Sequence, residues 1–290
     1  MQIILTGASG FLGRAIQKAL SSHTIISVGR NNANIIADLS KPIPDLPKME
    51  LIIHAAGKAH IVPKTEEEMQ DFFNVNVKGT QNLLTALESN LPERFVFISS
   101  VAVYGLSEGI MISEDQALNA QDPYGQSKIE AEKIITSWCK KNNVLCTFLR
   151  LPLLVGENPP GNLGALVKGI KKGYYMNIAG GLAKKSMVMA DDVANALIKA
   201  SFVGGIYNLT DGYHPSFKEL SNHIARQLGK KSPFNIPNWT AKLLANLGDM
   251  LGKKSPFNSY KLSKIKADLT FNDNKAKKAF GWNPRRVLLV

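Results

Sequence analysis

The sequence predicts an α/β fold, a doubly wound parallel sheet with a smaller C-terminal α/β part. Short apolar runs alternate with amphipathic helical patterns through the first half of the 290 residues, as expected of parallel strands joined by right-handed crossover helices. The run 95–98 is apolar at consecutive positions, which is typical of a strand covered on both faces. With 44% hydrophobic residues, the chain can bury a sizeable core.

The elements follow from these patterns in chain order. Strands are expected at 2–5, 25–28, 51–54, 95–99 and 144–154, and helices at 10–20, 66–87 and 123–140. Asp122 predicts the N-cap of the last helix, and Pro123 fits its first position. Beyond Gly156 the segments become shorter, richer in lysine and broken by glycine and proline. We therefore expect one part at 1–155 and a second at 156–290, some of whose segments return to the first.

Composition limits the classes of protein. Cys139 and Cys146 are the only cysteines, and no histidine or cysteine cluster surrounds them, so we expect reduced core thiols and no metal. Met1 enters the first strand directly, which predicts no secretory signal, and no apolar stretch approaches the roughly 20 residues of a membrane span. A cytoplasmic protein is expected.

The formal charge of +12 permits nucleic acid, an anionic membrane surface or a phosphate-bearing ligand as partner. The lysines come mostly as spaced pairs, from Lys171-Lys172 to Lys277-Lys278, rather than as one block. No interleaving of aromatic and basic residues accompanies them, so we expect no nucleic-acid binding. Two explanations of the positive charge remain: a solvated basic face and the binding of a diphosphate-bearing ligand.

One later stretch, 239–247, is amphipathic. We expect it to be a helix that caps the second part, and contact with a membrane or with a partner helix is the alternative.

A glycine loop connects the first strand to the first helix. In Thr6-Gly7-Ala8-Ser9-Gly10-Phe11-Leu12-Gly13, Gly7 allows the sharp turn, Gly10 lets a pyrophosphate approach the backbone and Gly13 permits close helix packing. The helix N-terminus offers unpaired N–H groups to the anion. The strand, loop and helix together predict dinucleotide binding by a Rossmann-type fold.

Arg30 follows the second strand, where NAD-binding proteins usually carry an acidic residue for the ribose hydroxyls. A guanidinium cannot accept from a hydroxyl but pairs well with a 2′-phosphate. NADP(H) is therefore favoured over NAD(H), with a plain surface role for Arg30 as the alternative.

Tyr124 and Lys128 lie four residues apart at the start of a helix and hence on one face. A cation beside a phenol favours phenolate, so we expect the pKa of Tyr124 to be lowered and the residue to act in proton transfer. Ser100 ends the preceding strand, where ligands bind in parallel sheets, and is expected to hydrogen-bond the reacting oxygen. His54 and His60 have no metal-ligand spacing and are interpreted as structural or loop residues.

With these motifs the chain resembles the extended short-chain dehydrogenase/reductases, and within them the group of nucleotide-sugar epimerases, dehydratases and reductases. The resemblance covers nearly the whole chain. Its marks are the glycine loop, Asp38-Leu39, His54-Ala55-Ala56-Gly57, Asn76-Val77-Lys78-Gly79-Thr80, Ser99-Ser100 before Val103-Tyr104-Gly105, Tyr124 with Lys128, and Asp191-Asp192-Val193.

The resemblance implies that Ser100, Tyr124 and Lys128 are the catalytic set, that Asp38 and Leu39 hold the adenine, and that Lys128 also contacts the nicotinamide ribose. The whole set expected at the cofactor is Gly7, Ser9, Gly10, Phe11, Leu12, Gly13, Arg30, Asp38, Leu39, Ala55, Ala56, Gly57, Asn76, Ser99, Tyr124, Lys128 and Leu151. The residues expected at the substrate are Val101, Tyr124, Asn162 and Lys185, with Lys185 replacing the arginine that many relatives use to grip a diphosphate. No metal is expected.

Two details narrow the implied activity. Family dehydratases carry an acidic pair after the position of Ser100, whereas Val101 and Ala102 stand here, and neither can protonate a departing hydroxyl. The segments 150–156 and 160–163 look most like bacterial enzymes that reduce or epimerise C4 of UDP-N-acetylhexosamines in surface-glycan precursor synthesis. A 4-ketoreductase and a 4-epimerase both fit, relatives are often homodimers, and the alternative is a catalytically silent NAD(P)-binding sensor.

Overall fold

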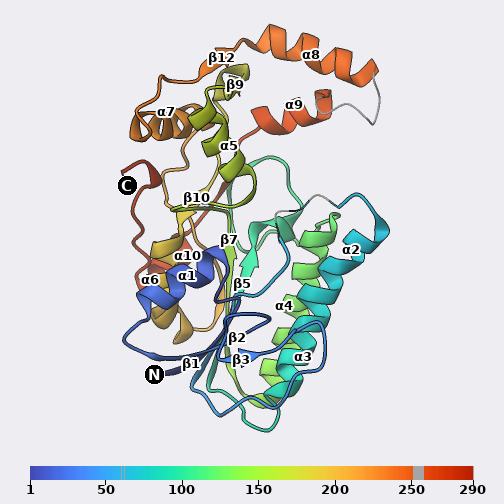
Figure 1. Cartoon of the computed structure of the whole chain (residues 1–290), viewed down its shortest axis with the longest axis vertical. Coiled ribbons are helices and arrows are strands. Elements are labelled where there is room, and N and C mark those ends of the chain that lie inside the picture. Colours follow the sequence, from blue (N-terminus) through green and yellow to red (C-terminus); the bar gives the residue numbers. More distant parts are fainter. Residues whose placement is uncertain (60, 62, 251–257, 290) are drawn as a thin grey trace.

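The computed structural model describes residues 1–59, 61, 63–250 and 258–289. Its main feature is a seven-stranded parallel sheet in the order β11-β7-β5-β4-β1-β2-β3 (Figure 1). The strands are β1 (Gln2–Thr6), β2 (Thr24–Gly29), β3 (Ile35–Ile36), β4 (Leu51–His54), β5 (Arg94–Ser100), β7 (Leu145–Leu151) and β11 (Gly205–Asn208). The order reverses at β1, as in a doubly wound sheet, so the predicted fold class is confirmed.

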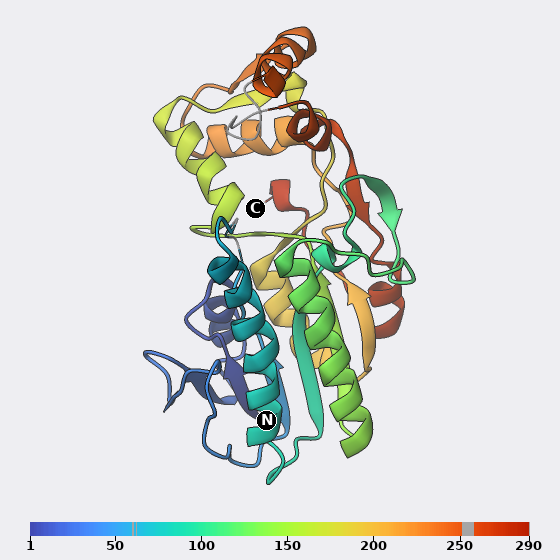
Figure 2. The ribbon, with the colours of Figure 1, turned by 90° about the vertical axis from the view of Figure 1, so that its right-hand side faces the viewer.

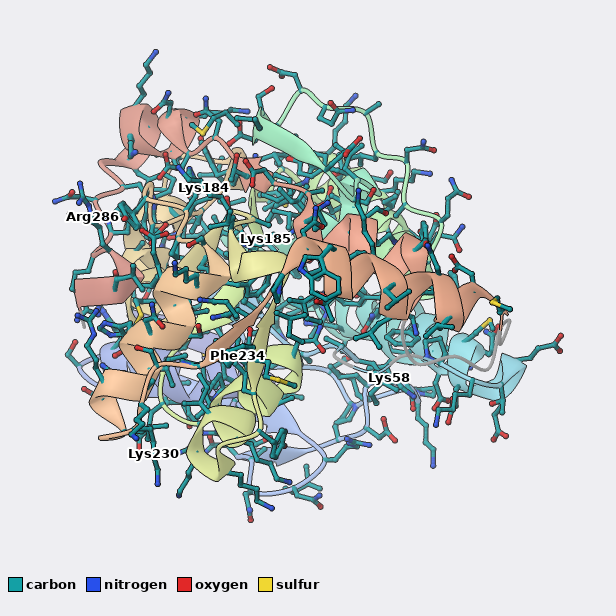
Figure 3. The ribbon with its side chains drawn as sticks, turned by 90° about the horizontal axis from the view of Figure 1, so that it is seen from above. Lys58, Lys184, Lys185, Lys230, Phe234 and Arg286 are labelled. Carbon is teal, nitrogen blue, oxygen red and sulfur yellow. The ribbon has the colours of Figure 1, made fainter. Side chains whose placement is uncertain are left out.

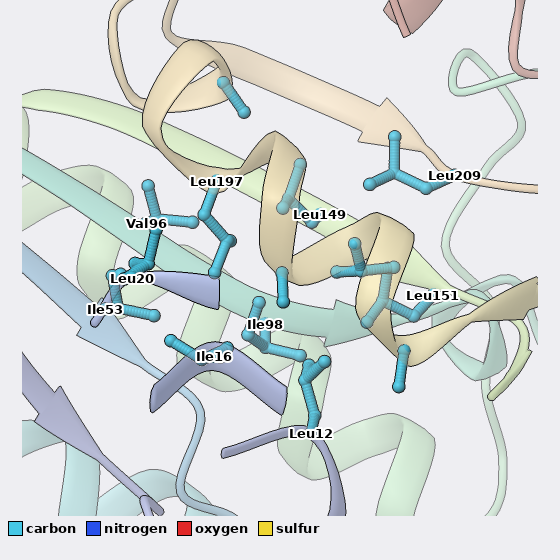
Figure 4. Close-up of a cluster of buried hydrophobic side chains, with 14 of the residues drawn as sticks. Leu12, Ile16, Leu20, Ile53, Val96, Ile98, Leu149, Leu151, Leu197 and Leu209 are labelled. Atoms are coloured by element: carbon cyan, nitrogen blue, oxygen red, sulfur yellow. The ribbon is translucent and has the colours of Figure 1, made fainter. Parts of the chain in front are cut away.

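Helices cover both faces of this sheet (Figures 1 and 2). One face carries α1 (Phe11–Ala19), α6 (Ala190–Ser201) and α10 (Asn274–Phe280), and the other carries α2 (Glu66–Phe73), α3 (Gly79–Ala86) and α4 (Pro123–Asn142). Each face has its own apolar cluster. In the first of these, Leu12 and Ile16 of α1 and Leu197 of α6 meet strand residues such as Leu149 (Figure 4).

The long helical pattern expected at 66–87 is interrupted by a π-helical turn at Asn74–Lys78, between α2 and α3. Such a turn widens the helix by one residue, and it occurs most often at functional sites. Here the turn contains Asn76, whose buried side chain belongs to the site described below.

The remaining elements form a second group near the ends of β5 and β7, in the upper part of Figure 1. They are α5 (Gly161–Lys172), α7 (Phe217–Gln227), α8 (Asn238–Met250), α9 (Ser259–Lys266) and the parallel strand pairs β8 (Leu153–Val155) with β10 (Met187–Met189), β9 (Met176–Ile178) with β12 (Phe234–Ile236), and β6 (Gly109–Ile112) with β13 (Leu269–Phe271). By contrast, α6 and β11 lie in the layers of the large sheet although they follow residue 156.

One predicted strand is wrong. The run 144–154 does not form a single strand, because the chain leaves the large sheet after Leu151 and Leu153 begins β8 in another sheet. Pro152 stands between the two. Proline has no N–H to donate to a ladder, so the strand is interrupted there.

Among the described residues, no helix combines the length and the apolar character that crossing a membrane requires. Cys139 and Cys146 are free thiols that pack on the α4 side of the sheet. No group of three or more potential metal-ligating side chains occurs in the described ranges.

The core of β7 provides a test of this packing. Leu149 is fully buried, whereas Leu145 on the same strand is 41% exposed. We expect L149A to lower the free energy of unfolding by about 2–5 kcal/mol, because it leaves a cavity between the sheet and α6. Urea unfolding measures the change in the free energy of unfolding. The matched control is L145A, for which we expect a much smaller decrease. Equal decreases in the two variants would contradict this packing.

Candidate active site

The glycine loop brings three stretches of backbone into close contact. Gly7 has a φ of +75°, and a Cβ there would lie 2.6 Å from the backbone nitrogen of Ala56. A Cβ at Gly13 would lie 2.0 Å from the carbonyl oxygen of Gly7. Gly10 is the N-cap of α1, and no side chain caps this helix. The first N–H groups of α1 are therefore available to an anion, as dinucleotide binding requires.

A buried chain of hydrogen bonds fixes the floor beside this loop. The backbone N–H of Ala56 donates to the Thr6 hydroxyl at 3.1 Å, and His54 bridges Thr6 (2.7 Å) and Thr80 (3.0 Å) through its two ring nitrogens. The Thr80 hydroxyl in turn donates to the carbonyl oxygen of Asn76 at 2.6 Å. Because the Thr80 hydroxyl uses its proton on Asn76, it accepts from His54 Nε2, and the imidazole proton therefore lies on Nε2.

His54 is therefore a structural residue, as the sequence suggested. Burial lowers its pKa to about 3, and the Lys128 ammonium adds to this effect, so the ring stays neutral over the working pH range. His60, the other histidine considered, lies outside the described residues.

Asn76 joins the π-helical turn to its surroundings. Its amide nitrogen donates to the Ser127 hydroxyl (2.9 Å) and to the backbone oxygen of Lys58 (3.1 Å), and its oxygen accepts from the backbone N–H of Lys58 (2.7 Å). A Cβ at Gly57 would lie only 3.2 Å from the Asn76 oxygen and 3.3 Å from Lys128 Nζ. This exposed glycine keeps open a cradle between an amide and an ammonium, which fits the polar ribose and nicotinamide end of a dinucleotide.

Tyr124 stands in the first turn of α4, where Asp122 caps the helix by accepting from the N–H of Gly125 at 3.0 Å. The expected lowering of its pKa is wrong for this structure. Burial raises the pKa of Tyr124, the Asp122 carboxylate adds to the rise, and only a hydrogen bond with Ser100 opposes it. The physical reason is that the Lys128 ammonium is engaged elsewhere.

Lys128 is buried, and its Nζ donates to the carbonyl oxygen of Ile98 at 2.9 Å. The same ammonium lies 4.5 Å from the centre of the Phe97 ring, an attractive cation–π arrangement. Burial lowers the pKa of Lys128 to about 8, against the opposing effect of the Glu132 carboxylate. The side chain is thus held between Gly57 and the end of β5.

A buried ion pair that no sequence motif indicated joins α4 to β7. Arg150 Nη2 of β7 lies 2.7 Å from Glu132 Oε2 of α4, and both side chains are less than a tenth exposed. Ser99 donates to the same carboxylate at 2.6 Å, and Arg150 also donates to Tyr104 Oη at 3.1 Å. An arginine in an otherwise apolar strand is the signal in the sequence that points to a buried partner. The packing of α4 against β7 determines that this partner is Glu132.

The candidate adenosine residues follow the neighbouring strands β2 and β3. Arg30 is exposed directly after β2, and its charge contributes to lowering the pKa of Asp38. The main causes of that shift are the hydrogen bonds from the backbone and side chain of Ser40. Leu39 is buried, and its carbonyl oxygen accepts from Asn82.

A cavity of about 260 Å³ contains three of the residues expected at the substrate, Val101, Asn162 and Lys185. Val101 follows Ser100, Asn162 belongs to α5 and Lys185 comes from the loop before β10. Lys185 Nζ donates to the carbonyl oxygen of Lys264 in α9 at 3.3 Å, and burial lowers its pKa. A single ammonium thus borders an otherwise largely apolar cavity.

Some expected cofactor residues have other environments. The side chains of Leu12 and Leu151 lie in the apolar cluster between the sheet and α6 (Figure 4), and the Ser99 hydroxyl is bonded to Glu132. The Phe11 ring packs near Gly156, where an added Cβ would be 3.0 Å away. Ser9 is exposed, and its carbonyl oxygen accepts from Arg14. Contacts of Leu12, Leu151 and Ser99 with a cofactor stay predictions.

The sequence matches the NAD dependent epimerase/dehydratase family over residues 3–209. This range includes the glycine loop, the Gly57 cradle, and Tyr124 with Lys128. The chain belongs to this family. The resemblance that the motifs indicated is confirmed, and with it the expected class of nicotinamide-dependent enzyme.

Relatives in the family carry epimerase names. The chain is 29% identical to N-acetyl-alpha-D-glucosaminyl-diphospho-ditrans,octacis-undecaprenol 4-epimerase of Escherichia coli O157:H7, over 80% of this chain and 73% of that protein. It is 26% identical to UDP-glucose 4-epimerase of Vibrio cholerae, over 99% of this chain and 92% of that protein.

A solved structure has the same fold. UDP-glucuronic acid 4-epimerase from Bacillus cereus, in complex with UDP-glucuronic acid and NAD, superposes with a TM-score of 0.75 at 19% identity, covering 99% of this chain and 95% of that one. This similarity supports the Rossmann-type architecture of the family.

The lowered pKa of Lys128 predicts a pH-dependent stability. Below about pH 8 the side chain is charged in both states, and burying the ammonium destabilises the folded protein. Between about pH 8 and 10.5 the folded side chain loses its proton while the unfolded one keeps it, so this destabilisation decreases as pH rises. The free energy of unfolding of the wild type should therefore rise relative to K128M across this window. Urea unfolding at several pH values measures the difference.

The matched control is K133M, which removes an exposed lysine from the same helix and should show no such change relative to wild type. A difference between wild type and K128M that stays constant from neutral to alkaline pH would contradict the burial of the ammonium.

Proposed function

We propose that this protein transfers hydride at C4 of a UDP-linked N-acetylhexosamine, as a 4-epimerase or a 4-ketoreductase. The observation that carries the proposal is the position of Tyr124, hydrogen-bonded to Ser100, one turn of α4 before Lys128, whose ammonium lies beside the Gly57 cradle. A proton-transfer group and a dinucleotide site then meet at one edge of the sheet, where parallel α/β folds bind ligands.

A bound nicotinamide dinucleotide would supply the hydride acceptor or donor, held by the glycine loop and by the Gly57 cradle. Tyr124 exchanges the proton of the sugar O4, and Ser100 donates a hydrogen bond to the same oxygen as its charge changes. Because burial raises the pKa of Tyr124, the phenol holds its proton in the resting site. Lys128, whose ammonium is bonded to the backbone oxygen of Ile98 in this structure, would stabilise a phenolate only after leaving that partner.

The substrate side is consistent with an N-acetylated sugar diphosphate. Val101 and Leu153 give the cavity apolar walls suited to an acetamido methyl group, and Lys185 provides a charge for a phosphate. The relative from Escherichia coli acts, by its name, on a diphosphate-linked N-acetylglucosaminyl group. With Val101 and Ala102 after Ser100, no acid is available to expel a hydroxyl as water, which argues against dehydration. Such chemistry fits precursor synthesis for bacterial surface glycans.

An assay with two substrates separates the two activities. Loss of nicotinamide absorbance with a UDP-linked 4-keto-6-deoxy-N-acetylhexosamine, in proportion to a new 4-hydroxy sugar, identifies a ketoreductase. Appearance of the C4 epimer from UDP-N-acetylhexosamine with oxidised cofactor identifies an epimerase. Cofactor binding without turnover of either sugar favours the silent sensor, against which the intact Tyr124–Ser100–Lys128 set argues.

Replacement of the phenol tests the site directly. We expect Y124F to lower turnover by about 10² to 10⁴-fold, because the proton of O4 loses its acceptor and donor, while cofactor affinity stays close to that of wild type. Steady-state rates and fluorescence titration measure the two quantities. Y174F changes an exposed tyrosine outside the site and should leave both unaffected, whereas wild-type turnover by Y124F would refute the assignment.

We further propose that the cofactor is NADP(H), held through Arg30. Its guanidinium is exposed after β2 and close enough to Asp38 to influence that carboxyl, in a place where a 2′-phosphate would replace the carboxylate as partner. R30A should weaken NADPH binding by about 10- to 100-fold, the value of a charge-assisted hydrogen bond, and leave NADH binding nearly unchanged. Titration with both cofactors measures this.

R226A, which removes an exposed arginine from α7, serves as the control and should alter neither affinity. Equal losses for NADPH and NADH in R30A, or tighter binding of NADH than of NADPH by the wild type, would overturn the preference.

A further inference from the structure

Helix α8 is oriented with its large apolar side chains away from the protein. Its buried residues are the small Ala241, Ala245 and Gly248. The two alanines pack with Leu262 of α9 and with Ile178, Ala179 and Ile236. The opposite face presents side chains spaced by three or four positions, as on one side of a helix. These are Trp239, Leu243, Leu247 and Met250, with Trp239 71% and Met250 84% exposed.

Two further exposed apolar side chains lie on the neighbouring strand pair. Phe234 of β12 lies opposite Met176 of β9 in register, and both side chains are exposed, Phe234 by 70%. We call these six side chains, Met176, Phe234, Trp239, Leu243, Leu247 and Met250, the docking face. Single exposed hydrophobic residues are ordinary, but a contiguous group marks an interaction site.

Basic residues outnumber acidic ones in the segments that carry and flank the docking face. In the described segments that carry and flank it, five lysines lie in 168–187, four basic residues in 226–250 and three lysines in 258–268, against only two carboxylates, Asp249 and Asp268. Figure 3 looks onto the molecule from the end that carries α8 and labels Phe234, Lys184, Lys185 and Lys230 in this view. The surface therefore combines apolar and cationic character.

A groove adjoins the docking face. It has a volume of about 540 Å³ and lies between the end of α5 and β12, with Tyr174, Tyr175 and Phe234 beside Lys230 and Lys231. Aromatic side chains next to lysines are typical of residues that lie at a membrane interface, where ring and ammonium contact the acyl boundary and the headgroups respectively.

We propose that the docking face binds the surface of a bilayer containing anionic phospholipids. An amphipathic helix with Trp and Leu outward and lysines around it inserts to the level of the headgroups, and each lysine near an anionic surface adds to the affinity. A second copy of this chain would bring a like-charged surface against it. The expectation that 239–247 caps the second part holds for the small-residue face, and the membrane alternative applies to the outer one.

The docking face is also connected to the candidate substrate cavity. Lys185, which borders that cavity, donates to the backbone oxygen of Lys264 in α9, and α9 packs directly against α8. A docked molecule would therefore hold the wall of its substrate cavity close to the bilayer. The docking itself requires neither sugar nor cofactor, so its test is independent of the proposed function.

Flotation of the full-length protein with vesicles tests the proposal. We expect binding to vesicles of phosphatidylcholine with phosphatidylglycerol at low salt, weak binding to phosphatidylcholine alone, and release at high salt, where surface charges are screened. The variant W239Q/L243Q/L247Q should bind the anionic vesicles about a hundredfold more weakly, because it lacks three apolar side chains that would transfer from water into the bilayer interface. K230Q/K231Q/K242Q should bind the anionic vesicles about fivefold more weakly for each lysine that is replaced.

The control I36Q/I110Q changes two exposed apolar residues outside the docking face and should bind like wild type. Circular dichroism checks that every variant is folded. The proposal is overturned if the wild type fails to float, if it binds neutral and anionic vesicles equally, or if W239Q/L243Q/L247Q binds as the wild type does. It is also overturned if sedimentation velocity shows a wild-type dimer that this variant abolishes while vesicles do not bind, since a second copy would then cover the face.

Discussion

The buried ion pair between Glu132 and Arg150 is the interaction on which the candidate site depends. It joins α4 to β7, and Ser99 of β5 donates a hydrogen bond to the same carboxylate, so that β5 is joined as well. Lys128 lies one turn before Glu132 on α4, and Tyr124 one turn before that, so the pair sets the position of both relative to the strand ends. Removing one partner would leave an uncompensated charge in the interior, which is strongly destabilising. This fixed geometry is what a proton-transfer site needs, because small displacements of the reacting groups are costly.

The hydrogen-bonded chain from Ala56 through Thr6, His54 and Thr80 to Asn76 complements this ion pair. It connects the glycine loop, the end of β4 and the π-helical turn, and it works only while the imidazole is neutral, which its burial ensures. The candidate cofactor side is thus tied together by buried hydrogen bonds, whereas the candidate substrate side is built from short strands and helices of the C-terminal half. Such an arrangement allows one cofactor floor to serve different sugars in the same family.

Features set by local sequence were predictable, and those set by distant partners were not. The glycine loop and the start of α4 at Asp122-Pro123 follow from steric and capping rules that act within a few residues. Pro152 is the local signal for the end of β7, although it stands within a continuous apolar run. The pKa of Tyr124 depends on where the Lys128 ammonium points, and its partner is a backbone oxygen of another element, which no side-chain pattern reveals. In the same way, an amphipathic pattern does not tell which face of α8 turns inward.

The most direct test of the account follows the hydride itself. A UDP-linked 4-keto-N-acetylhexosamine is incubated with the protein and with reduced nicotinamide cofactor carrying deuterium at the transferable position, and the sugar is analysed by NMR and mass spectrometry. The account predicts a 4-hydroxy sugar with one deuterium at C4, for a ketoreductase and an epimerase alike. A sugar that stays a ketone while the cofactor is bound, or a product whose new C4 hydrogen comes from water, would contradict it.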